Sequence, residues 1–253
     1  MLVGLTGGIA TGKSTVSALL GARGIPVLDA DHIAREVVLP GTKTLQALVD
    51  AFGDGILTQD GMLDRAALGR FVFHDATARE RVNAIMHPAI RSLMVTRARA
   101  LEAGNRSRVI ILDVPLLFEG EMHRVVDVTV LVYASRPQQL QRLMKRNQLT
   151  DSEANARIDA QMSTEQKRRM ATIIVENDGS LSGLQARVDR LCDVLAEFAR
   201  EVLADEQNAA RVVGSLRAED GVNAAQVEEA QLGDVSQPGM NVARAARSQV
   251  VIS

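Results

Sequence analysis

The sequence predicts an α/β protein in which helices flank a five-stranded parallel sheet. The first observation is that the apolar run Leu2–Leu5 ends in a glycine-rich turn, as a buried strand of a parallel sheet does. The second is that 14–21 has helical spacing of apolar residues and precedes another apolar run, Ile25–Asp29. Strand, helix and strand within about 30 residues form a βαβ unit.

Three further apolar runs complete the predicted sheet. They are Val109–Asp113, Val128–Tyr133 and Ala171–Val175. Strands that are apolar on both faces need helices on both sides of the sheet. Two long helical stretches interrupt this core: an insertion at about 33–108, far longer than an ordinary crossover, and a helical segment at about 137–170. The second stretch is rich in arginine and glutamine, and we interpret it as a lid.

Composition excludes several classes of protein. Of the 253 residues, 46% are hydrophobic and 24% charged, which is ordinary for a globular chain and unlike a disordered or membrane-bundle sequence. The net charge of −2 gives no electrostatic footprint for nucleic acid, so we expect no nucleic-acid and no membrane partner. Cys192 is the single cysteine, and the N-terminal residues do not resemble a signal peptide. We therefore expect a cytoplasmic protein, and a monomer or weak homo-oligomer.

The end of the chain differs in composition from the rest. Residues 204–253 are rich in Ala, Gln, Asn, Gly and Ser and contain no aromatic side chain. We interpret 1–203 as one catalytic unit and 204–253 as a low-complexity, flexible tail.

The strongest motif is Gly7–Thr15, which matches G-x-x-x-x-G-K-[ST] between a predicted strand and a predicted helix. Its glycines let successive N–H groups point at phosphate oxygens, and the helix that follows adds its positive end. Lys13 is placed to reach the β and γ phosphates, and the Ser14 hydroxyl to bind Mg²⁺. The motif predicts a nucleotide-binding protein with the P-loop NTPase fold.

Carboxylates follow two of the predicted strands. Asp29 and Asp31 lie two apart, at the sheet edge where ligands of open parallel sheets bind. They could polarise an acceptor hydroxyl or hold Mg²⁺; alternatively, Asp31 caps the next helix. Asp113 could contact Mg²⁺ through water, or it simply ends its strand.

Two arginines stand four residues apart in the predicted lid. Arg142 and Arg146 would share one helix face, where they could close over the transferring phosphoryl group. The alternative is a solvated charged face.

These residues resemble the dephospho-CoA kinase family, in order over about residues 1–200. The matching segments are Leu5–Thr15, Asp29–Arg35, His87-Pro88, Val114–Glu119, Gln139–Arg146, Ala160-Gln161 and Asn177. The resemblance implies that ATP phosphorylates the ribose 3′-hydroxyl of dephospho-CoA, giving CoA and ADP, in the final step of coenzyme A biosynthesis. It also implies that the insertion is a CoA-binding domain.

The same resemblance assigns roles to residues. Asp31 would act as the general base, with Lys13 and Arg142 as the other catalytic residues. ATP would be bound by Gly8, Ala10, Thr11, Gly12, Lys13, Ser14, Thr15, Arg142, Arg146 and Asn177. Dephospho-CoA would be bound by Asp29, Asp31, His32, Arg35, His87 and Leu116, and Mg²⁺ by Ser14 and Asp113. His87-Pro88 could instead mark the start of a helix.

Two positions depart from the family pattern: Thr172, where the family usually has Asp after Ala, and Asn147, where it usually has Asp after Arg.

Two other functions are alternatives to dephospho-CoA kinase. A nucleoside monophosphate kinase shares the loop and lid arginines, but not the segments at 29–31 and 114–119. A GTPase would need a guanine-reading N-K-x-D motif, which the sequence lacks, although Asp50–Gly53 fits the loose D-x-x-G pattern.

Overall fold

The computed structural model describes residues 1–73, 75–103, 109–219 and 249–253, with the helix positions after 204 described by backbone alone. Within these ranges six parallel strands form one sheet in the order β2-β3-β1-β4-β5-β6. The strands are β1 (Leu2–Gly7), β2 (Val27–Asp29), β3 (Ile110–Asp113), β4 (Val128–Tyr133), β5 (Ile173–Glu176) and β6 (Val250–Ile252). The predicted parallel α/β sheet is confirmed, except that it has six strands rather than five.

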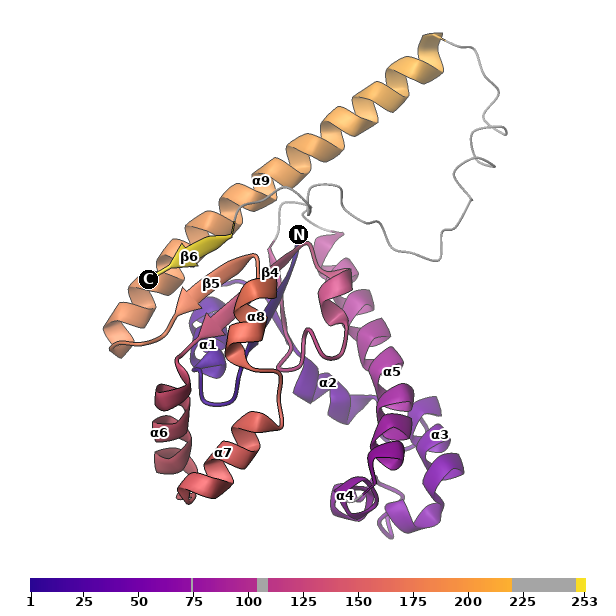
Figure 1. The fold of residues 1–253 in the computed structure, drawn as a ribbon. Helices are drawn as coiled ribbons and strands as arrows, with labels where there is room; N and C mark the ends of the chain where they lie inside the picture. Colours follow the sequence, from indigo (N-terminus) through magenta and orange to yellow (C-terminus); the bar gives the residue numbers. More distant parts are fainter. Residues whose placement is uncertain (74, 104–108, 220–248) are drawn as a thin grey trace.

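One face of the sheet is covered by α1 (Lys13–Ala22) and α9 (Leu181–Glu219). Successive side chains of a strand point to opposite faces, so Val3 and Leu5 meet Val16 and Leu20 of α1 on this side. From α9 the residues at helical spacing pack here, including Leu184, Val188, Leu191 and Leu195, all of them buried. In Figure 1, α9 continues as a straight helix well past the end of the sheet.

The other face carries the predicted insertion. Its elements are α2 (Ala30–Glu36), α3 (Lys43–Phe52), η1 (Asp54–Ile56), α4 (Arg65–Phe73) and α5 (Ala76–Glu102). Leu2, Ile110 and Leu112 of the sheet share a buried cluster with Met94 and Ala98 of α5. The long helix α5 therefore rests on the sheet at its C-terminal end and carries α3 and α4 away from it (Figure 1).

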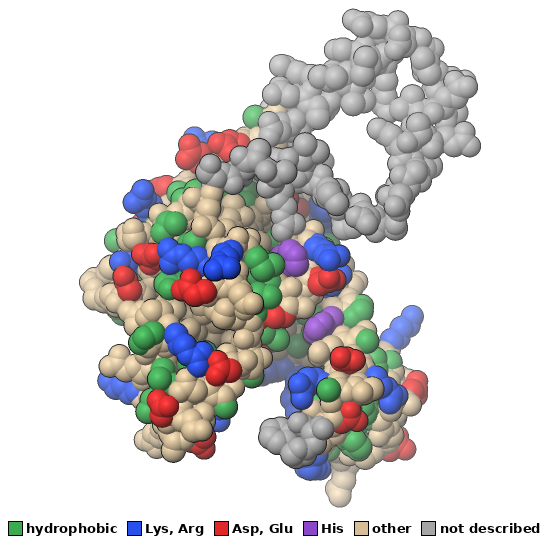
Figure 2. Space-filling view, in the orientation of Figure 1, with side chains coloured by type: hydrophobic (Ala, Val, Ile, Leu, Met, Phe, Trp, Pro, Cys, Tyr) green, Lys and Arg blue, Asp and Glu red, His purple; other side chains and the backbone are tan. Residues whose placement is uncertain are grey.

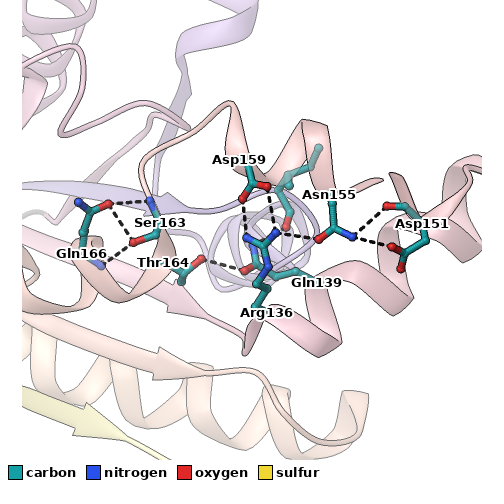
Figure 3. Close-up of polar contacts among 9 residues, drawn as sticks. Arg136, Gln139, Asp151, Asn155, Asp159, Ser163, Thr164 and Gln166 are labelled. Carbon is teal, nitrogen blue, oxygen red and sulfur yellow. Dashed lines mark hydrogen bonds and ion pairs between the residues drawn. The ribbon is translucent and has the colours of Figure 1, made fainter. Parts of the chain in front are cut away.

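The predicted lid consists of α6 (Arg136–Asn147), α7 (Asp151–Asp159) and α8 (Thr164–Met170). Arg136 joins the first two helices, because its guanidinium donates to Asp159 Oδ1 (2.6 Å) and to Asn155 Oδ1 (2.7 Å), as Figure 3 shows. Ser163 and Gln166 form a capping box that starts α8 (Figure 3). The lid is thus built from short helices, each with its own local start signal.

The sixth strand comes from residues that the sequence analysis assigned to a tail. Val250–Ile252 pairs with β5 in parallel, and the Ile252 side chain is completely buried in the core cluster beneath α9. Residues 220–248 of the predicted tail lie outside the described ranges. Three apolar residues after a long polar stretch are too short a run to predict a strand, and burial against α9 is what makes them one.

Two local expectations about helices and strands are wrong. The strand β2 ends at Asp29, so Asp31 lies in the first turn of α2 rather than on the strand beside Asp29. His87 and Pro88 lie in the middle of α5, not at a helix start. The neighbouring helical turns hold Pro88 in place even though it donates no backbone hydrogen bond. Among the described helices, none combines the length and apolar character needed to cross a membrane.

Candidate active site

The loop between β1 and α1 has the backbone that phosphate binding requires. Gly12 has a positive φ of 93° and Ala10 one of 61°, so successive N–H groups turn inward. The side-chain amide of Asn177 donates to the carbonyl of Thr11 (2.8 Å) and lies so close to Gly12 that a Cβ there would collide with it. Asn177, which follows β5, therefore stabilises the conformation of the phosphate loop.

Lys13, at the start of α1, forms an ion pair with Asp113 at the end of β3. The side chains of both are largely buried, with 17% of Lys13 and 5% of Asp113 exposed. Burial raises the pKa of Asp113, and the charge of Lys13 partly opposes this rise. The nearby carboxylate of Asp29 raises it further. Asp113 is thus the carboxylate that pairs with the lysine of the phosphate loop.

Asp29 and Asp31 have separate tasks. Asp29 is the N-cap of α2, and its carboxylate accepts from the backbone N–H groups of Asp31 (2.7 Å) and His32 (3.3 Å). The interpretation of Asp31 as the cap is therefore wrong. The Asp31 side chain is exposed in the first helical turn, while Asp29 stands opposite Asp113 in the strand register. A solvent-facing carboxylate thus lies at the same sheet edge as the Lys13–Asp113 pair.

The predicted lid contacts the phosphate loop through two glutamines for which the sequence predicted no role. The N–H of Ile9 donates to Gln161 Oε1 (3.0 Å), and its carbonyl accepts from Gln139 Nε2 (2.8 Å). Thr164 of α8 donates to Gln139 Oε1 (3.0 Å), a contact drawn in Figure 3. A Cβ on Gly8 would come within 2.6 Å of the Gln139 amide. No sequence pattern announces these contacts, because they depend on the approach of three separate elements.

The two lid arginines occupy different environments. Arg142 donates through Nη2 to the carbonyl of Asn177 (2.8 Å), while its Nη1 is buried without a hydrogen-bond partner among the described residues. Arg146 is exposed and donates to the neighbouring Asn147 (2.9 Å). The structure brings Arg142, and not Arg146, to Asn177, the residue whose side chain holds the phosphate loop.

The remaining acceptor candidates are spread along the insertion side of the sheet. His32 pairs through Nδ1 with Glu36 Oε1 (2.9 Å), and Arg35 is exposed. Leu116 is 42% exposed in the loop after β3. His87 lies beside Gly120 of that loop, and its pKa is lowered by burial and by the charge of Arg91. They do not form one contact cluster.

A cleft separates the two groups of helices below the sheet. Figure 2 shows the lobe of α6 and α7 standing apart from the lobe of α3, α4 and the outer half of α5. A groove of about 390 Å³ also lies within the insertion, lined by the end of α2, the segment after it, and parts of α3 and α5, among them Glu36, Leu39 and Ser92. This groove is separate from the phosphate loop.

The two departures from the family pattern have partners of their own. The backbone N–H of Thr172 donates to Thr129 Oγ1 (2.9 Å), and the two hydroxyls lie 3.2 Å apart. Asn147 accepts from Arg146.

A phosphate loop whose lysine pairs with a neighbouring carboxylate, next to short helices and a cleft between two helical lobes, is the arrangement of a P-loop kinase of small molecules. The comparisons with known proteins give the particular family. The chain belongs to the dephospho-CoA kinase family, whose model matches residues 1–183. These enzymes are transferases of coenzyme A biosynthesis.

Related proteins and structures agree over the same region. The dephospho-CoA kinase of Oceanobacillus iheyensis is 45% identical over 191 residues, which cover 76% of this chain and 96% of the relative. The crystal structure of TT1252 from Thermus thermophilus is 38% identical with a TM-score of 0.63. The dephospho-CoA kinase from Campylobacter jejuni is 25% identical with a TM-score of 0.62. Each structural match covers 78% of this chain and 97% of the other.

Proposed function

We propose that this site transfers the γ-phosphoryl group of ATP to the ribose 3′-hydroxyl of dephospho-CoA, with Asp31 as general base and Lys13 as the main electrophilic contact. The different structural positions of Asp29 and Asp31 support this proposal most directly. Asp29 Oδ1 accepts the two backbone N–H groups that cap α2, whereas the Asp31 carboxylate takes no part in this cap and is exposed at the sheet edge that also carries Lys13. A free carboxylate there can accept a proton as the bond to phosphorus forms.

The nucleotide half of the site would bind ATP through the loop amides and Lys13. Amides from Gly8 to Thr15 would surround the β and γ phosphates, with Lys13 leaving Asp113 for the γ phosphate. The donor set fits Mg²⁺: the exposed Ser14 hydroxyl opens α1, and the Asp113 carboxylate lies close by. Bound Mg²⁺ would neutralise charge on the phosphates. Among the described residues there is no group of three or more His, Cys, Asp or Glu side chains that could hold a metal ion.

The lid would complete the nucleotide site. The buried Nη1 of Arg142 has a donor to spare, and we assign it to ATP. Asn177 would lie near the adenine while it fastens Thr11. Arg146 would reach the nucleotide only after the lid moves, because in this structure it is exposed and bonded to Asn147.

The acceptor half would be formed by α2, the loop after β3 and the insertion. Asp29 would act there by fixing the first turn of α2, which orients Asp31 and His32. Leu116 offers an exposed apolar surface to the acceptor, and His87 stands beside the same loop. Arg35 is an exposed cation on α2 that could meet a phosphate of dephospho-CoA.

One assay tests this function against its rivals. The chain is incubated with ATP and dephospho-CoA, with ATP and AMP or CMP, and with GTP alone. We expect rapid phosphorylation of dephospho-CoA and none of the nucleoside monophosphates. Preferred phosphorylation of AMP or CMP, or GTP hydrolysis without an acceptor, would refute the proposal. Omitting Mg²⁺ should stop the reaction.

The role of Asp31 is tested by Asp31→Asn. This change keeps the shape of the side chain but removes its charge and basicity, so we expect kcat to fall by roughly 100-fold or more. ATP affinity, measured by titration of the same variant, should change little. Collapse of ATP binding with normal kcat at saturating ATP would instead make Asp31 a nucleotide or metal ligand.

Cellular location and assembly are also part of the proposal. We place the protein in the cytoplasm, acting on small molecules as a monomer or weak homo-oligomer, without nucleic acid or membrane partners. The near-neutral charge of −2 is consistent with this. Light scattering of the purified chain across a concentration series tests its assembly, and fractionation of cells tests its location.

A further inference from the structure

The seven residues from Gln161 to Lys167, which connect α7 to α8 and begin α8, touch both sides of the proposed site. Toward the phosphate loop, Gln161 Oε1 accepts from the N–H of Ile9 (3.0 Å). Thr164 supports the second contact to Ile9 by donating to Gln139 Oε1 (3.0 Å; Figure 3). This connecting segment is therefore fixed to the loop that would hold ATP.

The same segment also holds the loop after β3. The N–H of Met162 donates to Glu119 Oε1 (3.2 Å), and Lys167 Nζ donates to that oxygen (2.9 Å) and to the carbonyl of Pro115 (3.1 Å). The Thr6 hydroxyl of β1 donates to the same Pro115 carbonyl (3.0 Å). The loop 114–120 begins next to Asp113, the partner of Lys13, and carries the exposed Leu116.

The far end of this loop is attached to the insertion. Arg91 of α5 donates to the carbonyl of Gly120 (3.2 Å), close to His87. The loop 114–120 thus lies between the lid, the first strand and the proposed CoA-binding domain. Its position sets where an acceptor bound there stands relative to the phosphate loop.

Lys167 has the unusual feature among these contacts: its side chain is completely buried. A buried ammonium group must be compensated for lost hydration, and an apolar side chain of similar length would fill the same space without that cost. Its partners, Glu119 and the Pro115 carbonyl, lie in one loop. The charge therefore fixes that loop at a defined place against α8, which general apolar packing would not do.

We propose that Lys167 is a positioning residue that holds the loop 114–120 in register with the phosphate loop. Gln161, at the other end of the connecting segment, does the same for Ile9. The inference rests on the proposed function, since it takes the loop as one wall of the acceptor site. It makes opposite predictions for the two ends: Lys167 controls the acceptor, and Gln161 controls ATP.

The test measures steady-state kinetics for both substrates in variants along the segment. For Lys167→Met we expect a KM for dephospho-CoA raised about tenfold or more and a lowered kcat, because small misplacements of a bound reactant cost rate steeply. Its KM for ATP should stay within about twofold of the wild type. Gln161→Leu should show the reverse split, raising the KM for ATP.

Matched variants separate positioning from plain stability. Arg168→Met removes an ion pair from the same helix, the 3.1 Å contact with Glu176 of β5, and should lower Tm without changing the KM for dephospho-CoA. Glu119→Gln keeps Lys167 in place and should shift the same KM as Lys167→Met, by less. In the double variant the two effects should not add, because both act through one contact.

Two results would overturn the inference. In the first, Lys167→Met changes the KM for ATP and the KM for dephospho-CoA equally. Arg168→Met then changes both KM values in the same way, in proportion to its loss of Tm. In the second, Glu119→Gln leaves the KM for dephospho-CoA unchanged. This second test can be made even if Lys167→Met does not fold. Failure of the wild-type chain to phosphorylate dephospho-CoA would refute the proposed function before any variant is compared.

Discussion

At the scale of single residues, the ion pair between Lys13 and Asp113 joins the phosphate loop to the end of β3. A lysine of a phosphate loop needs a counter-charge when no phosphate is present, because a largely buried ammonium group without a partner is costly. Asp113 supplies it at the end of β3, and burial raises the pKa of this carboxyl. In the proposed reaction the γ phosphate of ATP would replace Asp113 as the partner of Lys13, and the Asp113 carboxylate would then be available to a phosphate-bound cation.

Replacing Lys13 should lower turnover without unfolding the chain. In Lys13→Ala the γ phosphate loses its point charge in a water-poor site, and we expect turnover to fall by a factor on the order of 100 or more. The variant should still fold, since Asp113 can take up a proton once its partner is gone. Rate assays together with circular dichroism check both parts. Near-normal turnover would contradict the assignment of the phosphate loop.

Residues of the site differ in how far sequence could predict them. The loop Gly7–Thr15 is a local motif, so its position and backbone follow from the residues alone. Asp29 and Asp31 could be located but not separated, because which of them caps α2 depends on where β2 ends. Gln139 and Gln161 stand in the segments that match the family, but their roles, and that of Lys167, could not be predicted, since each depends on a partner far away in the chain.

At the scale of elements, apolar runs in the sequence predicted the strands well, whereas local sequence signals predicted poorly where a long helix continues. β4 was predicted with its observed bounds, because a strand buried on both faces is apolar almost throughout, with Thr129 as the exception here. In α5 the proline at position 88 suggested a boundary, yet the helix runs through it from Ala76 to Glu102. Packing of α5 on the sheet and on α2, α3 and α4 outweighs the lost hydrogen bond, and no local pattern reports such packing.

The interior position of His87 in α5 predicts a pH dependence of stability. Burial and the charge of Arg91 lower its pKa below the ordinary 6.5, so the unfolded chain binds a proton there more readily than the folded one. Stability from this residue is therefore present above about pH 6.5 and is lost as the pH falls below it.

This dependence is measured by urea unfolding at several pH values between 7.5 and 5.5. The neutral variant His87→Gln should lack this contribution, so the stability of the wild type should fall relative to it toward low pH. His32→Gln serves as a control on an exposed histidine. Parallel pH curves for the wild type and His87→Gln would contradict the assignment.

At the scale of the whole molecule, the chain returns to its own sheet. The family model ends at residue 183, near the start of α9, yet β6 joins the edge of β5 some 70 residues later. Gln249 adds to this anchorage, since its amide donates to the carbonyls of Arg168 (2.6 Å) and Ala171 (2.8 Å) at the end of α8. Residues 249–252 therefore support β5 and the end of α8, the last helix of the predicted lid.

Deleting residues 249–253 should cost stability rather than catalysis. The deletion exposes the edge of β5 and removes the buried Ile252, whose side chain alone is worth roughly 1.5–3 kcal/mol of burial. For a chain of this size we expect a fall in Tm of about 5 °C or more, by calorimetry. The rate at 25 °C should stay within about twofold, since the sheet order separates β6 from β1 and its phosphate loop by two strands.

Single substitutions distinguish the buried side chain from the rest of the strand. Ile252→Ser should reproduce most of the loss in Tm, because it places a hydroxyl in the core cluster beneath α9. Val251→Ser is the matched control: its side chain points outward and is 40% exposed, so Tm should change little. An edge of β5 left open would also favour pairing with other chains, so the deletion variant should aggregate more readily on heating. If the deletion left Tm and aggregation unchanged, β6 would not be a stable part of the sheet in solution, and the core would end with α9.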